Sequence, residues 1–214
     1  KLQLCTRNIK MAVIPDVMLG RIRTQTHLDK RHIRGIERAS AKVLEEQPHL
    51  RSAYAILLAL GFKYKSILKA LQSFQGVPHR IEQLGMLGNI LFVNDSAATI
   101  PEAVHFSYAK YRTMAVHLIC GGTDKNLQAE GMLEELLHAS SLSLLDGSFT
   151  RGKLIPLLEK HHIPYYGPFK SMGDALQQSY EMAREKEQEL PNLVQAILLS
   201  PGSASFELFA NEFD

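Results

Sequence analysis

The chain has 214 residues, of which 45% are hydrophobic and 21% are charged, and its formal net charge is only +2. This composition is typical of a globular protein, and the length suffices for one large or two small domains. The small net charge gives no field that would attract nucleic acid, and no apolar run approaches the length of a membrane span. We therefore expect a soluble protein with neither a nucleic-acid partner nor a membrane partner.

The two cysteines, Cys5 and Cys120, are far apart in the sequence and fit no CxxC or Cys/His ligand spacing. They indicate neither a disulfide framework nor a zinc site, and a reducing cytoplasm is the compartment that fits them. The nine histidines show no HExxH spacing, so the sequence predicts no metal ligands.

Basic side chains gather near the start of the chain, in the run "GRIRTQTHLDKRHIRG" at 20–35. Such a run can bind phosphate or nucleic acid, but a solvated helix face or a chain end is the interpretation that we favour. The chain begins at Lys1 without an initiator Met and without the apolar core of a signal peptide. We interpret this beginning as internal to a longer protein.

Residues 34–74 have the periodicity of a helical pair, interrupted at Gly61. The apolar stripe that defines the pair consists of Leu50, Ala53, Tyr54, Leu57 and Leu58, followed by Ile67, Leu68, Leu71 and Phe74. We place a domain boundary near Gly76, between a mainly helical part at 1–76 and a second domain at 77–214.

Beyond this boundary, apolar runs that end in small or polar residues alternate with helical patterns. The runs predict strands at 90–94, 115–122, 142–148 and 196–203, and the patterns predict helices at 101–112, 127–139, 151–161 and 172–188. A hairpin around 85–89 would lead into the first of these strands. The alternation predicts an α/β fold with a Rossmann-like, mostly parallel sheet and helices on both faces.

Polar loops rich in glycine or serine follow the predicted strands. They read "NDSAAT", "GGTDK", "DGSFT" and "SPGSAS". In sheets of this kind ligands bind beyond the carboxyl ends of the strands, so we predict that these loops line one site.

The first loop contains more polar groups than a turn requires. Thr99 and Glu102 have the spacing of a capping box and Pro101 stands early in the helix, so we expect Thr99 to cap it. Capping does not explain Asn94 and Asp95, for which we favour a functional role.

Three further residues can recognise an anion, each with an ordinary structural alternative. Lys125 follows two glycines and offers a point charge to a carboxylate or phosphate, although a glycine turn beside a solvated lysine is equally consistent. Ser205 precedes the last helix, whose free N–H groups can bind an anion or simply be capped. Arg80 has a planar fork suited to phosphate or carboxylate, while its neighbour His79 is more often structural.

In their order and spacing, "FQGVPHRIE", "VNDSAAT", "GGTDK" and "LLSPGSASFELF" resemble the C-terminal part of the Mur ligases, in the branch of the family that adds D-glutamate. Each motif alone is weak, but together they are specific, and the resemblance covers about 50–214. The sister ligases and folylpolyglutamate synthase share the architecture but commonly carry a different turn where this chain has "NDSAAT".

The resemblance implies an ATP-dependent amide ligase of peptidoglycan synthesis. ATP would phosphorylate the carboxylate of UDP-N-acetylmuramoyl-L-alanine, and the amine of D-glutamate would attack the acyl phosphate. Residues 1–76 would then be the helical end of the central ATP-binding domain, and 77–214 the C-terminal domain. ATP and Mg²⁺ would be bound mainly by an upstream domain that this chain lacks, so we expect the fragment to be inactive alone.

The resemblance also implies roles for individual residues, with Thr99 and Lys125 acting in catalysis. The expected nucleotide contacts are Arg80 and Asp95, and the expected D-glutamate contacts are Thr99, Lys125, Ser205 and Phe206.

The chain departs from the family pattern at Ala97, where many members have a lysine, so Lys125 or Arg80 would carry more of the charge neutralisation. In addition, Glu212 stands where an aromatic residue is expected, and "PHLRS" is the nearest counterpart of an expected His-Asn pair. Two alternatives stay open: a stand-alone, non-catalytic α/β binding module, or a related Mur or folylpolyglutamate-type ligase.

Overall fold

The computed structural model describes residues 50–74 and 76–204, and the chain divides into two compact units between Gln75 and Gly76. The assignment of the units to the central and C-terminal domains of a ligase stays a prediction. Several features of the sequence lie outside the described residues: Cys5, the basic run at 20–35, Ser205, Phe206, Glu212 and the first two residues of "PHLRS".

The described part of the first unit is a pair of helices, α4 (Leu50–Ala59) and α5 (Tyr64–Gln72), separated by a turn in which Gly61 has a φ of +85°. This left-handed conformation suits glycine, which has no Cβ to clash. The buried side chains of the pair are Tyr54, Ile67, Leu68 and Leu71. Within the described residues, the helical pair is therefore as the sequence predicts, and most of its predicted apolar stripe packs together.

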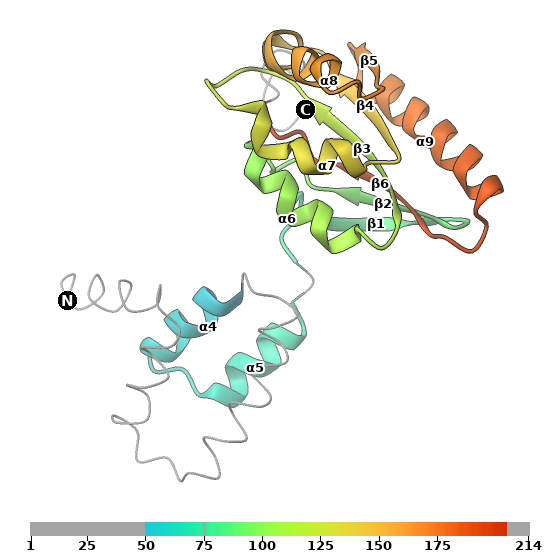
Figure 1. Cartoon of the computed structure of the whole chain (residues 1–214). Helices are drawn as coiled ribbons and strands as arrows, with labels where there is room; N and C mark the ends of the chain where they lie inside the picture. The colour runs from blue at the N-terminus through green and yellow to red at the C-terminus, as the bar shows by residue number, and fades with distance from the viewer. Residues whose placement is uncertain (1–49, 75, 205–214) are drawn as a thin grey trace. The chain divides into compact units, whose positions relative to one another are not determined.

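The second unit is built on a six-stranded sheet with the strand order β1-β2-β6-β3-β4-β5 (Figure 1). All neighbours pair in parallel except β1 and β2, which form the antiparallel hairpin expected from the sequence. The strands are β1 (Glu82–Leu87), β2 (Ile90–Asn94), β3 (Ala115–Gly121), β4 (Ser141–Leu145), β5 (Tyr166–Phe169) and β6 (Gln195–Leu199).

Helices cover both faces of this sheet (Figure 1). The helical elements are α6 (Pro101–Tyr111), the 3₁₀ turn η1 (Ala129–Met132), α7 (Leu133–His138), the π-helical turn η2 (Thr150–Leu154), α8 (Ile155–Lys160) and α9 (Met172–Glu189). Side chains of α6, η1, α7, η2 and α8 share one apolar core with one face of the sheet. Of the described helices, only α9 contributes to the core on the other face. The predicted α/β fold is thus confirmed.

The central strands are buried along their whole length, which is why they read as continuous apolar runs. Cys120 lies in β3 with no exposed surface, and burial raises the pKa of its thiol to about 12. It therefore acts as a small apolar core residue. In the ranges 50–74 and 76–204, no helix combines the length and the apolar character needed to cross a membrane.

Candidate functional site

The four loops that follow β2, β3, β4 and β6 are joined by hydrogen bonds at the carboxyl edge of the sheet. Gly202 N donates to Ala98 O (2.8 Å), Thr123 N donates to Ala204 O (2.7 Å), and Phe149 N donates to Gly122 O (2.9 Å). Because these bonds link each loop to the next, the loops form one continuous surface. The sequence-based expectation that they lie at one edge agrees with this geometry.

Glycine is required where the loops after β3 and β4 meet. Gly122 has a φ of +138°, and a Cβ there would collide with Ala204 O and lie 2.9 Å from Ser203 Oγ. Gly147 has a φ of +154°, and its added Cβ would collide with the carbonyl of Gly122. A side chain at either position would push the loops apart, so the close approach of the backbones depends on both glycines.

Asp95 is a buried anchor of this edge, with 5% of its surface exposed. Its Oδ1 accepts from Ile81 N (3.1 Å) and its Oδ2 accepts from Ser200 Oγ (3.0 Å). Ser200 Oγ also lies 3.0 Å from Ser107 Oγ on α6. The carboxylate thereby ties the segment before β1, the end of β6 and helix α6 to the end of β2.

The segment that carries Arg80 has a strained backbone. His79 and Ile81 flank Arg80 and have φ values of +63° and +51°, a conformation that costs free energy, most of all for a β-branched residue. Glu82 Oε2 accepts from His79 N (2.9 Å), and Asn94 Nδ2 donates to His79 Nδ1 (3.0 Å). These bonds hold His79 on one side of the exposed Arg80, and the bond from Ile81 N to Asp95 holds the other side. Nothing in the sequence indicates this strain.

Thr99 does not cap helix α6, contrary to the prediction from its spacing to Glu102. The helix begins at Pro101, its N-cap is Ile100, and no side chain caps it by a hydrogen bond. The start at residue 101 is as predicted, with proline in its favoured first helical position, but the residue at the N-cap is therefore Ile100 and not Thr99. Thr99 is exposed beside Ala98, the residue that bonds to the loop after β6.

Ala97 donates its backbone N–H to His79 O (3.0 Å). This contact belongs to the main chain, so the way the turn is held does not depend on the methyl group of Ala97.

Lys125 is exposed in the loop after β3. Thr123, two residues earlier, forms a bridge with Ala204, the last described residue before the predicted contacts Ser205 and Phe206. The next residue after Lys125, Asn126, has a φ of +60°, which asparagine tolerates better than most side chains. The loop that carries Lys125 thus borders the segment that leads to the predicted D-glutamate contacts.

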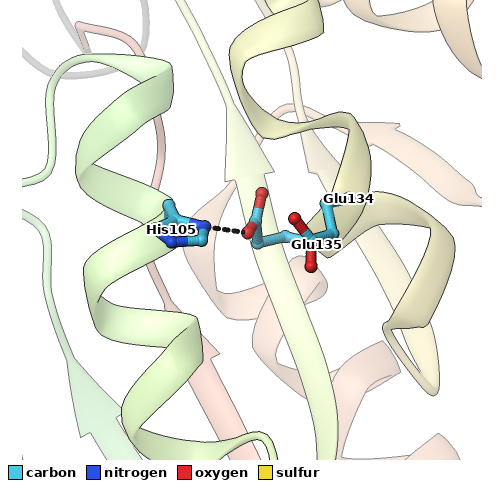
Figure 2. Close-up of side chains that lie close together, drawn as sticks. All are labelled: His105, Glu134 and Glu135. Atoms are coloured by element: carbon cyan, nitrogen blue, oxygen red, sulfur yellow. Dashed lines mark hydrogen bonds and ion pairs between the residues drawn. The ribbon is translucent and has the colours of Figure 1, made fainter.

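A separate polar cluster lies between helices α6 and α7 (Figure 2). His105, Glu134 and Glu135 have ligand atoms within 4.8 Å of one another. His105 Nδ1 and Glu135 Oε1 are 2.7 Å apart, and Glu135 is 3% exposed. Burial, with the Glu135 charge as a second cause, raises the pKa of Tyr108 to about 12. The hydrogen bond between the helices accounts for this cluster as a packing contact.

Comparisons with known proteins agree with this architecture, although no protein-family model matches the chain. Over 76% of this chain and 36% of the other, the structure resembles the UDP-N-acetylmuramate-alanine ligase MurC of Thermotoga maritima, with a TM-score of 0.50 and 14% sequence identity. The fold is therefore one found in the Mur ligases.

The sequence is also similar to proteins named UDP-N-acetylmuramoylalanine–D-glutamate ligase. The protein from Treponema pallidum is 41% identical over 150 residues, which is 70% of this chain and 26% of that protein. The protein from Borreliella afzelii is 34% identical over 164 residues, which is 76% of this chain and 34% of that protein. The chain belongs to the Mur ligase family, and it spans about a third or less of the length of these relatives.

Proposed function

We propose that this chain is part of a cytoplasmic, ATP-dependent ligase that joins D-glutamate to UDP-N-acetylmuramoyl-L-alanine in peptidoglycan synthesis. The proposal rests on one observation: hydrogen bonds join the loops after β2, β3, β4 and β6 at the carboxyl edge of the sheet, and Lys125 is exposed on one of these loops. The similarity to D-glutamate ligases supplies the identity of the substrates. In this proposal, the sheet unit binds D-glutamate and the fragment alone is inactive.

The proposed amino-acid site uses charge and hydrogen-bond donors at this edge. Lys125 would bind a carboxylate of D-glutamate with its ammonium group, and Thr99 would donate its hydroxyl from the neighbouring loop. Ser205 and the backbone at Phe206 would complete the site. Holding the amine close to the acyl phosphate would supply much of the rate enhancement.

The proposed nucleotide contacts lie on the segment before β1. Arg80 would pair its guanidinium with phosphate, a geometry to which the planar fork is suited. Asp95 would contribute to nucleotide binding indirectly, by holding the backbone of Ile81 next to Arg80. Both of its oxygens already accept hydrogen bonds from within the protein. Arg80 would therefore be the contacting residue and Asp95 its positioning residue.

The described carboxylates at this edge do not fit a Mg²⁺ site. Mg²⁺ prefers carboxylate oxygens that are free to coordinate it. Asp95 uses both oxygens on Ile81 and Ser200, and Asp124 forms an ion pair with Lys153 (2.9 Å). We therefore assign no metal ligand to these loops and place MgATP binding mainly in a part of the ligase outside this chain.

The proposed reaction has two steps. An oxygen of the substrate carboxylate attacks the γ-phosphorus of ATP, an O–P bond forms, and ADP leaves. The amine nitrogen of D-glutamate then attacks the acyl carbon, an amide forms, and inorganic phosphate leaves while the amine proton passes to solvent. Cations such as Lys125 and Arg80 would offset the negative charge that gathers in both steps.

The test is ADP release by the longer ligase that contains this chain, with ATP and UDP-N-acetylmuramoyl-L-alanine present. We expect ADP release that depends on D-glutamate and is much weaker with L-glutamate. The two isomers have opposite configurations at Cα, so a site that holds the carboxylates of D-glutamate would place the amine of L-glutamate differently. Release that is independent of D-glutamate, or equal with both isomers, would contradict the proposal.

A further inference from the structure

The loop that carries Lys125 is shaped by the carboxylate of Asp124. Asp124 Oδ1 accepts from Leu127 N (3.2 Å), and the backbone N–H of Asp124 donates to Ser148 Oγ (3.0 Å). The side chain therefore bridges the loop from Asp124 to Leu127, and Lys125 and Asn126 lie at the tip between these points. Such Asp-centred turns are common, but they fix the tip only while the carboxylate keeps its position.

Lys153, on the π-helical turn η2, fixes that carboxylate. Its Nζ lies 3.0 Å from Asp124 Oδ1 and 2.9 Å from Asp124 Oδ2, and it donates to Leu127 O at 2.8 Å. An ammonium group has three donors, and here three acceptors surround it. The ammonium thus ties together both ends of the segment that presents Lys125.

The ionisation of Asp124 is consistent with this contact. The hydrogen bond from Lys153 is the main cause that lowers the pKa of Asp124 below its ordinary value, and the backbone N–H of Leu127 adds to it. The carboxylate is therefore charged throughout the pH range in which a ligase works. The Lys153 side chain is 31% exposed and that of Asp124 is 25% exposed, so water screens the pair only in part.

A second ion pair on η2 lacks this arrangement. Arg151 bonds to Asp146, with Nε 2.7 Å from Oδ1. Asp146 lies in the loop between β4 and η2, so these contacts are local in sequence. Lys153 reaches across to the loop after β3. Arg151 and Lys153 are two positions apart in the sequence. Comparing variants at these two positions therefore separates the loss of an ion pair on η2 from the loss of the contact that holds the Lys125 loop.

We propose that Lys153 is a positioning residue for D-glutamate binding, acting through Asp124 and Leu127 to hold Lys125 at the substrate's carboxylate. The inference rests on the proposed function. It predicts that Lys153 affects the use of D-glutamate more than the use of ATP or of the UDP-linked substrate.

The test compares Lys153→Met, Lys153→Arg and the control Arg151→Met in the longer ligase. We expect Lys153→Met to raise the KM for D-glutamate about tenfold or more, because small displacements of a binding group have large effects. Its KM for ATP should stay within about twofold. Lys153→Arg should recover part of the loss, since a guanidinium can still bind both oxygens of Asp124. Arg151→Met should leave the KM for D-glutamate unchanged.

Hydrogen–deuterium exchange of the same proteins gives a readout that does not depend on turnover. The backbone amides of Lys125, Asn126 and Leu127 should exchange faster in Lys153→Met than in the wild type, and not in Arg151→Met. Equal exchange, or equal increases in the KM of all three substrates, would overturn the inference. A wild-type ligase without D-glutamate dependence would instead overturn the proposed function, while the exchange data would still report on the loop.

Discussion

The two ends of the parallel strands use polar residues in opposite ways. Near their amino ends, His117, Ser141 and Gln195 lie buried on neighbouring strands and bond to one another, with His117 2.8 Å from Ser141 Oγ and 3.1 Å from Gln195 Oε1. At the carboxyl ends, backbone groups join the loops and leave Arg80, Thr99 and Lys125 exposed. Polar side chains are thus buried between strands at one end, whereas the other end exposes the side chains of the proposed site.

Asp95 shows that position alone does not decide between these uses. It stands at the carboxyl end of β2, yet its carboxylate is buried and bonded in the same manner as the polar residues at the opposite end. The difference is one of burial: Asp95 is 5% exposed and both of its oxygens accept hydrogen bonds from within the protein, whereas Arg80, Thr99 and Lys125 are exposed.

The largest expected effect is on Lys125. We expect Lys125→Ala to lower kcat/KM for D-glutamate about 10²–10³-fold in the longer ligase, as removal of a charged or hydrogen-bonding group at a reacting centre does. Steady-state ADP release measures it. Lys160→Ala, at the exposed end of α8, should have no effect. Unchanged turnover in Lys125→Ala would show that the amino-acid site lies elsewhere.

The second effect tests whether the carboxyl edge depends on close backbone packing. We expect Gly122→Ala to lower the free energy of unfolding by about 2–3 kcal/mol, because the φ of +138° is strained for alanine and the Cβ meets Ala204. Urea denaturation measures it. Gly152→Ala is the matched control, since nothing lies within 4 Å of its added Cβ. Equal stability of the two variants would contradict the packing argument.

The third effect concerns the buried polar group at the amino ends. Burial is the main cause that lowers the pKa of His117, the bond to Gln195 opposes it, and Lys186 adds to it. Protons therefore bind His117 more readily in the unfolded chain than in the folded one. The free energy of unfolding keeps its full value above about pH 6.5 and falls as the pH drops below that value, by up to about 1.4 kcal/mol per pH unit.

This dependence can be measured by thermal or urea unfolding between pH 7 and pH 5. We expect His117→Gln to flatten the curve relative to the wild type, and the control His138→Gln, on an exposed residue of α7, to leave it unchanged. An equally steep loss of stability in His117→Gln would show that other groups cause it.

The smallest effect concerns the bond between helices α6 and α7 (Figure 2). We expect His105→Ala to lower the free energy of unfolding by about 1 kcal/mol, because it removes the partner of the buried Glu135 carboxylate. The exposed pair of Lys186 and Glu189 on α9 should contribute less, about 0–0.5 kcal/mol. Differential scanning calorimetry of His105→Ala and Lys186→Ala compares them, and the reverse ranking would contradict burial as the cause.

Most of the fold could be predicted from the sequence because the central strands are buried on both faces. Residues 90–94 form β2 as predicted, and β3, β4 and β6 begin within one residue of the predicted strands. Strand β5 (Tyr166–Phe169) was missed, since it is four residues long, lies at the sheet edge and is mostly exposed. A short exposed strand that contains glycine and proline has no apolar run to reveal it.

The candidate site was less predictable, because the sequence shows residue types and not their partners. Thr99 has the spacing of a cap, but Pro101 occupies the first helical position and the N-cap is therefore Ile100. Asp95 has the character of a ligand group, yet Ile81 and Ser200 occupy its oxygens. Lys153 stands 28 residues after Lys125 in the sequence, inside an ordinary helical pattern, so only the fold reveals its contact with the Asp124 turn.

The position of β6 has a consequence for how this unit is made. Of the described strands, β6 comes last in the sequence, yet it lies between β2 and β3 and is the one that pairs with both. During synthesis, the hairpin of β1 and β2 and the sheet of β3, β4 and β5 therefore have to wait, unjoined, until Gln195–Leu199 leaves the ribosome. Because this pairing links distant parts of the chain, its closure is a slow step of folding. The Asp95–Ser200 contact forms only after this pairing, so the carboxyl edge of the sheet is completed late in folding.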